Sequence, residues 1–200
     1  MEKAKERYRW VIEVIVYLGS IMLGMIMFSI GPMLITLTQE LQITFTKAGL
    51  LSGIIALVLG IFALISGAVS GRIGLKLTMC LGITIMALGG IISGILPNYT
   101  LVFIGRVLFA VGAGLFFPMV GAVIMQWFSD KELLVVNSVN FSGMTAGVAI
   151  GLLITTPLIE AFGWRATLIL YGAFCGVIAI LSWPLLKERS TAVSSVAQDI

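Results

Sequence analysis

Six long apolar runs restrict the folds open to this sequence more than any other feature. Each is about as long as the ~20 mainly apolar residues that a helix needs to cross a membrane. Short stretches with charged or helix-breaking residues separate them, which predicts six membrane-spanning helices. The runs cover residues 10–37, 48–70, 75–96, 101–127, 133–159 and 167–186.

Composition indicates that lipid surrounds most of the chain. Hydrophobic residues make up 60% of the sequence and charged residues 10%, whereas a soluble domain carries about 25% charged residues. In lipid, only helices and closed barrels satisfy their own backbone hydrogen bonds. The runs are too long for barrel strands and lack apolar–polar alternation. The expected fold class is therefore an all-α membrane protein.

The basic residues fall mostly on one side of the predicted membrane. Of the twelve Lys and Arg residues, nine lie on one side and two on the other, and Arg106 lies inside the fourth run. Basic residues mark the cytoplasmic side, so both termini are expected there. We expect residues 1–9 to be a cytoplasmic N-terminus, residues 10–186 the transmembrane bundle and residues 187–200 a cytoplasmic polar tail. The nine are Lys3, Lys5, Arg7, Arg9, Arg72, Lys76, Lys131, Lys187 and Arg189.

The turn between the second and third runs, GAVSGRIGLK at residues 67–76, has an unusual pattern of glycines and cations. One interpretation is that its cations anchor the turn on the cytoplasmic side and that its glycines allow the turn. The pattern also resembles the signature loop of the major facilitator superfamily, G-x-x-x-D-R-x-G-R-K. The matching positions are Gly67, Arg72, Gly74 and Lys76.

The loop departs from the family pattern at two positions. Gly71 stands where the family usually has Asp, and Leu75 stands where it often has Arg. The resemblance implies a cytoplasmic gating loop that binds neighbouring helix ends and favours one access state. Without the acid, the packing role of the glycines remains and the charge relay does not.

Three further stretches resemble the same family in the same order along the chain. LGMIMFSIGP at 23–32 is similar to its first helix, GRVLFAVGAG at 105–114 to its fourth, and AFGWRATLILYG at 161–172 to the turn before its sixth. The resemblance covers residues 10–186. It implies the N-terminal half of a twelve-helix carrier, with six helices arranged as a 3+3 repeat and a solute moved by alternating access.

Small residues form one-sided rows on two of the predicted spans. In lipid such rows mark helix interfaces. They could pack within this six-helix bundle or face a second half, and the family resemblance implies that the second and fifth helices line the seam between halves. We therefore expect a partner: a second copy of this chain or a separate six-helix half. A truncated or split carrier is a third possibility. The glycines are Gly53 and Gly60 on the second span, and Gly143, Gly147 and Gly151 on the fifth.

Arg106 lies deep inside the fourth predicted span, and no acid lies at its depth. Proline lacks an amide hydrogen, so Pro32 introduces a helix kink and leaves the carbonyl of Phe28 without its usual donor. We predict that the guanidinium binds backbone carbonyls of the first span near Phe28. Alternatively, it snorkels outward to the membrane surface.

Three other residues within predicted spans are candidates for a functional role: Glu13, Asn137 and Asn140. Glu13 lies near the cytoplasmic end of the first span, which favours snorkelling or an ion pair with Arg9 over a role in proton coupling. Asn137 and Asn140 lie roughly 7 and 12 Å inside the fifth span at 1.5 Å per residue. Buried amides need hydrogen-bond partners, from another helix or from a polar solute. Together with Arg106, these residues are the candidates for binding substrate or a coupling ion.

The function expected from these features is secondary transport of a small solute across the inner (plasma) membrane of a prokaryote. Histidine is absent, and neither paired carboxylates at one depth, a metal-ligand cluster nor a phosphate-binding loop is evident. We therefore expect no enzyme, metal, cofactor or nucleic-acid partner; the partners are lipid, a small-molecule substrate and a second half. The motifs of the fifth span lean toward a small organic anion. The alternatives are an accessory or regulatory six-helix membrane protein, or a truncated carrier fragment.

Overall fold

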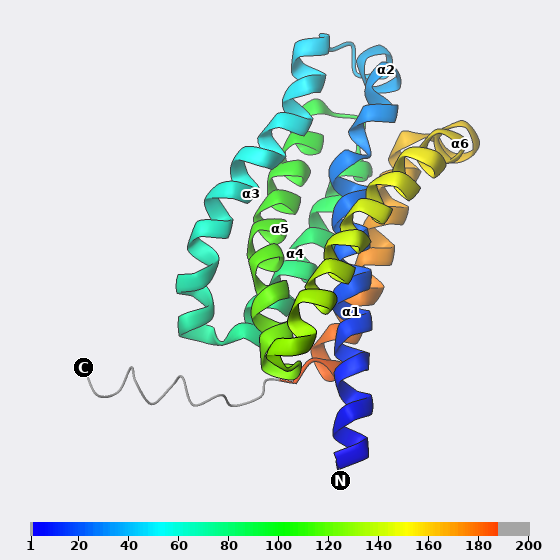
Figure 1. The fold of residues 1–200 in the computed structure, drawn as a ribbon. Helices are drawn as coiled ribbons and strands as arrows, with labels where there is room; N and C mark the ends of the chain where they lie inside the picture. The colour runs from blue at the N-terminus through cyan, green and yellow to red at the C-terminus, as the bar shows by residue number, and fades with distance from the viewer. Residues whose placement is uncertain (1, 188–200) are drawn as a thin grey trace.

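The structure, a computed structural model, describes residues 2–187, and of residues 2–7 only the backbone (Figure 1). All the regular structure in this range is α-helical, which confirms the all-α part of the expected fold class. Apart from Lys187, the expected cytoplasmic tail lies outside the described residues. The helices are α1 Glu2–Phe28, α2 Ile30–Glu40, α3 Phe45–Ile73, α4 Leu75–Ile95, α5 Tyr99–Trp127 and α6 Asp130–Leu185.

The described chain contains five helical segments that are long and apolar enough to cross a membrane, where the sequence predicted six. The difference lies in α6, which extends over 56 residues, or about 84 Å at 1.5 Å per residue, whereas the apolar core of a membrane is about 30 Å thick. The first predicted run remains one segment, Tyr8–Glu40, although it consists of α1 and α2. It is interrupted only at Ser29, whose hydroxyl donates to the carbonyl of Ile26 over 2.9 Å.

The long helix α6 folds back on itself at Gly163. This residue has φ 79° and ψ 160°, which no helix contains. The hydroxyls of Thr155 and Tyr171 lie 2.8 Å apart, although their 16-residue separation in a straight helix would place them about 24 Å apart. Figure 1 shows the first part of α6 in yellow and the second part returning beside it in orange. The two last predicted runs therefore lie in the two arms of α6.

The turn in α6 repeats the geometry of the turn between α3 and α4. Gly74 has φ 89° and ψ 157°, close to the angles of Gly163. The side chain of Thr78 donates to the carbonyl of Gly74 over 2.8 Å, and that of Thr167 donates to the carbonyl of Gly163 over 2.9 Å. Only glycine adopts this backbone conformation readily. The same Gly-x-x-x-Thr device thus reverses the chain at two places.

Helix α4 lies at the centre of the bundle and packs on α5 and α6 through glycines. A Cβ built on Gly82 would lie 3.0 Å from the carbonyl oxygen of Gly112 on α5. One built on Gly90 would lie 2.9 Å from the Cα of Gly172 on α6. These close approaches are the usual way that helices associate in lipid. Helix α3 packs mainly on α5 and lies at the edge of the bundle, as Figure 1 shows in cyan.

The two rows of glycines lie in different surroundings. A Cβ on Gly147 would overlap the carbonyl oxygen of Ile21, and one on Gly143 would lie 2.7 Å from the ring of Tyr17; both neighbours belong to α1. Gly151 likewise packs on Met25 of α1. This row therefore binds the first helix of its own chain, contrary to the expectation that it faces a second half. By contrast, Gly53 and Gly60 on α3 have no atom within 4 Å of an added Cβ.

Candidate solute-binding cavity

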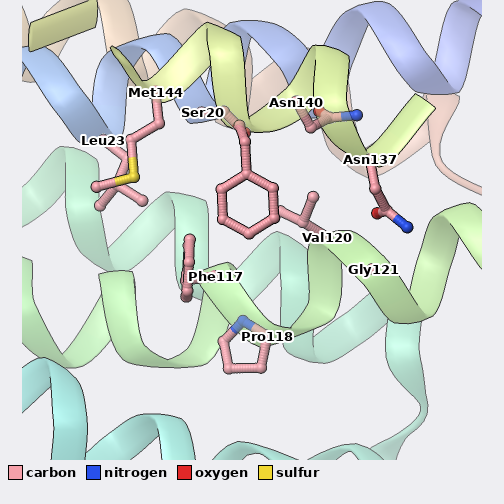
Figure 2. Close-up of a pocket in the computed structure, with 10 residues that line it drawn as sticks. Ser20, Leu23, Phe117, Pro118, Val120, Gly121, Asn137, Asn140 and Met144 are labelled. Atoms are coloured by element: carbon pink, nitrogen blue, oxygen red, sulfur yellow. The ribbon is translucent and has the colours of Figure 1, made fainter. Parts of the chain in front are cut away.

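A cavity of about 230 Å³ opens between α1, α5 and the first arm of α6. Figure 2 shows Asn137, Asn140 and Met144 of α6 on one side of it and Phe117 and Pro118 of α5 on the other. The position fits a solute site because three separate helices meet there. The lining residues are Ser20, Leu23, Phe117, Pro118, Val120, Gly121, Asn137, Asn140, Phe141 and Met144.

The walls of the cavity are largely apolar and include two aromatic rings. The rings of Phe117 and Phe141 meet edge to face, with centroids 6.0 Å apart and planes inclined at 80°. This is one of the preferred arrangements of an aromatic pair. Although Ser20 contributes a hydroxyl, it already donates to the carbonyl of Val16 over 3.0 Å. The polar contacts of a bound solute would therefore come from the two asparagines and from the oxygen of Ser20, which can still accept.

Asn140 is held in one orientation by its neighbours. The residue is 3% exposed. Its amide nitrogen donates to Oε1 of Glu13 over 2.7 Å and to the carbonyl of Val136 over 3.1 Å, which uses both of its hydrogens. Its carbonyl oxygen is buried and has no hydrogen-bond partner among the described residues. The polar atom that Asn140 leaves without a partner is thus an acceptor and not a donor.

Glu13 lies inside the bundle at 6% exposure, so it does not snorkel to the surface. The predicted ion pair between Arg9 and Glu13 is also wrong. Arg9 pairs with Glu132 at the start of α6 over 3.0 Å, and Glu13 turns toward Asn140. The second carboxyl oxygen of Glu13, Oε2, has no partner among the described residues.

Arg106 lies away from the cavity, at the interruption between α1 and α2. It is fully buried, which rules out the alternative that it snorkels outward. One terminal nitrogen donates to the carbonyl of Ile26 over 2.8 Å, and the other donates to the hydroxyl of Ser29 over 3.1 Å. The carbonyl is two residues before that of Phe28, to which the sequence pointed. Pro32 lies in the first turn of α2.

The glycine-rich loop at residues 67–76 lies on α3 and α4, whereas α1, α5 and α6 line the cavity. Arg72 is exposed at the end of α3, Gly74 makes the turn, and Lys76 is half-buried in the first turn of α4. An added Cβ on Gly67 or Gly71 would meet nothing within 4 Å. The structure therefore joins Glu13, Asn137 and Asn140 around one region and leaves Arg106 and the loop at two others.

The two aromatic residues that line the cavity were not identified from the sequence. Phe117 and Phe141 are ordinary residues in apolar runs, and nothing in their spacing marks them. One available signal was Pro118, which interrupts the hydrogen bonding of α5 next to Phe117. Among the described residues, no group of three or more His, Cys, Asp or Glu side chains could hold a metal ion.

Comparison with known proteins identifies a matching family and several relatives. The family model described as Major Facilitator Superfamily matches residues 16–198. The chain is 28% identical over 163 residues to the "Probable L-galactonate transporter" of Escherichia coli (strain K12), a match that covers 82% of this chain and 36% of that protein. It is 25% identical over 151 residues to the "Hexuronate transporter" of Bacillus subtilis (strain 168), covering 76% of this chain and 36% of the relative.

A third relative is the 4-hydroxybenzoate transporter of Pseudomonas aeruginosa. It is 27% identical over 187 residues, which cover 92% of this chain and 41% of that protein. Each of these relatives is therefore matched over well under half of its length.

Proposed function

The chain belongs to the Major Facilitator Superfamily, and we propose that it is one six-helix half of a secondary transporter for a small organic solute. The observation that carries the proposal is the cavity between α1, α5 and α6, where the buried Asn140 presents an oxygen without a partner. A buried polar atom without a partner costs free energy. A solute that supplies the missing hydrogen bond would remove that cost.

The two Gly-x-x-x-Thr turns support a 3+3 arrangement of six spans. Gly74 follows the second span and Gly163 follows the fifth, so each turn joins the second and third helices of a triplet. Internal repeats of this kind are typical of secondary transporters that work by alternating access. The excess of basic residues on one side supports cytoplasmic termini in a bacterial inner membrane.

The open face of α3 supports a second half as the partner. Gly53, Gly60 and Gly67 leave a smooth strip that no other part of the described chain approaches within 4 Å of an added Cβ. Such strips allow close packing of helices in lipid. The relatives named above are more than twice as long as their matched parts, so they have length enough for a second bundle. We propose that a second six-helix half packs on this strip.

Each candidate residue has a part in the proposal. Asn137 and Asn140 contact the solute, and Glu13 holds Asn140. Arg106 holds the junction between α1 and α2. The loop at residues 67–76 gates the cytoplasmic side.

An organic anion is the proposed solute class because the named relatives are transporters of galactonate, hexuronate and 4-hydroxybenzoate. The cavity has no Lys or Arg in its lining. The carboxylate of such a solute would therefore contact the second half.

Uptake into membrane vesicles tests the proposal. Vesicles are prepared from cells that produce the chain and from the same cells lacking it, so that any natural second half is present. Labelled galactonate, a hexuronate and 4-hydroxybenzoate are supplied separately. The proposal predicts chain-dependent uptake of at least one of them. Equal uptake by both kinds of vesicle, together with co-purification of the chain with an intact carrier, would instead support the accessory protein.

A further inference from the structure

We infer that the cavity selects a solute with a single planar ring that carries a hydrogen-bond donor, and that Asn140 recognises that donor. The inference rests on the proposed function, because it names the class of solute that the same site would take. It depends on three observations: the size of the cavity, the chemistry of its walls and the fixed orientation of one amide.

The volume fits one ring. An apolar cavity of about 150 Å³ accommodates benzene in an otherwise well-packed protein. The cavity here is about 230 Å³, which leaves space for one or two small substituents on such a ring.

The walls favour a ring over an open-chain sugar acid. Phe117, Phe141 and Pro118 offer flat or edge-on apolar surfaces, against which a planar ring packs well. A sugar acid would bring a hydroxyl on almost every carbon into contact with them. The side-chain partners are few: Asn137, Asn140 and the hydroxyl of Ser20, which already donates within α1 and can only accept. Most hydroxyls would lose their bonds to water without replacement, which is costly.

The orientation of Asn140 decides which polar group the solute carries. Both amide hydrogens are engaged, by Glu13 and by the carbonyl of Val136. Reversing the amide would place its oxygen against the carboxyl oxygen of Glu13, two acceptors facing each other. The amide oxygen that remains can only accept. A hydroxyl or N–H on the ring fits this site, whereas a ring without a donor leaves the oxygen unsatisfied.

Glu13 is therefore a positioning residue that acts through Asn140. Its Oε1 accepts the bond that fixes the amide. Glu13→Gln keeps an oxygen at this position, whereas Glu13→Leu removes it. If Glu13 only filled space, the two substitutions would have the same effect on solute binding.

Titration calorimetry tests the inference on the chain in lipid nanodiscs, purified together with any second half that assembles with it. Three probes separate the features: 4-hydroxybenzoate has ring and donor, benzoate has the ring alone, and galactonate has donors without a ring. We expect 4-hydroxybenzoate to bind about tenfold more tightly than benzoate, the usual value of one hydrogen bond to a buried acceptor. We expect galactonate to bind more weakly than both.

Variants assign the effect to residues. Asn140→Leu should abolish the preference for the hydroxylated ring, and so should Glu13→Leu, while Glu13→Gln should retain it. Phe117→Leu should weaken both ring probes alike. The matched control is Phe174→Leu, because Phe174 is 57% exposed on the second arm of α6 and does not line the cavity.

The inference is overturned if galactonate binds most tightly, if benzoate equals 4-hydroxybenzoate, or if neither ring compound binds. The comparison among probes on the unsubstituted chain gives this answer even where a variant does not fold. None of these results decides whether the chain takes part in transport, since chain-dependent uptake of galactonate would uphold the proposed function while the ring preference fails.

Discussion

The guanidinium of Arg106 donates a hydrogen bond over 2.8 Å to the backbone carbonyl of Ile26, 80 residues earlier in the chain. A second bond reaches Ser29, at which the first membrane segment is interrupted. A cation buried in this way is costly unless it is well bonded. The bonds link α5 to the junction of α1 and α2. The cavity lies elsewhere along the same two long helices, α1 and α5.

Replacing Arg106 should therefore weaken the junction. Each hydrogen bond from a charged group contributes about 1.5–3 kcal/mol, so Arg106→Ala should lower the thermal midpoint in detergent and reduce uptake. Arg106→Lys keeps the charge but cannot reach both acceptors in the same geometry, and an intermediate effect is expected. Ser29→Ala removes one acceptor and should be milder than either. If neither Arg106 substitution changed uptake, Arg106 would have no part in the mechanism.

The two glycine rows should respond oppositely to an added methyl group. Gly147→Ala should destabilise the isolated chain by about 1–3 kcal/mol, because the Cβ would overlap the backbone of α1. Gly53→Ala places the same group where nothing lies within 4 Å and should leave stability equal or slightly higher. Thermal unfolding of both variants in the same detergent compares them. A stable Gly147→Ala variant would show that α1 and α6 do not pack as described.

A larger substitution tests the open strip on α3. Gly60→Leu should leave the thermal midpoint of the isolated chain unchanged, since the side chain would extend into empty space. In cells that contain the proposed second half, it should prevent the two from co-purifying, because the strip would no longer be smooth. Ile65→Ala is the control, because Ile65 is 43% exposed on the same helix but lies about 140° around it from Gly60; assembly should be unchanged. Unimpaired assembly of Gly60→Leu would place the partner elsewhere.

The turn in α6 should require glycine because of its backbone angles and not because space is lacking. Gly163→Ala should cost about 1–3 kcal/mol, because φ of 79° with ψ of 160° is strained for any residue with a Cβ, although no atom lies within 4 Å. Gly74→Ala should cost a similar amount because the angles are nearly the same. Gly49→Ala, in the helical first turns of α3, is the control and should not destabilise. A tolerated Gly163→Ala would mean that the chain reverses differently.

Much of this fold could be predicted from the sequence because lipid imposes simple rules. Apolar runs of membrane length must be helical, so the helices and their approximate ends followed directly. A buried arginine without an acid partner needs hydrogen-bond acceptors. Pro32 led to the correct prediction that Arg106 binds the first span, at a carbonyl two residues from the one observed. The sharp turn at Gly163 also matches a predicted separator between spans.

Long-range pairing could not be predicted in the same way. A row such as Gly143, Gly147 and Gly151 marks an interface but does not identify the helix on the other side. The spacing of Arg9 and Glu13 suits an ion pair on one helix, yet Glu132 on α6 is the actual partner of Arg9. Phe141 faces a cavity that exists only once α1, α5 and α6 are assembled.

The most direct measurement is the uptake of labelled 4-hydroxybenzoate and galactonate by vesicles whose chain carries Asn140→Leu, compared with vesicles containing an equal amount of the unsubstituted chain. If the cavity is the solute site of a carrier, chain-dependent uptake should fall at least about tenfold, the value of one lost hydrogen bond. Undiminished uptake of the solute that the unsubstituted chain transports would contradict the account, since the path would then lie elsewhere in the protein.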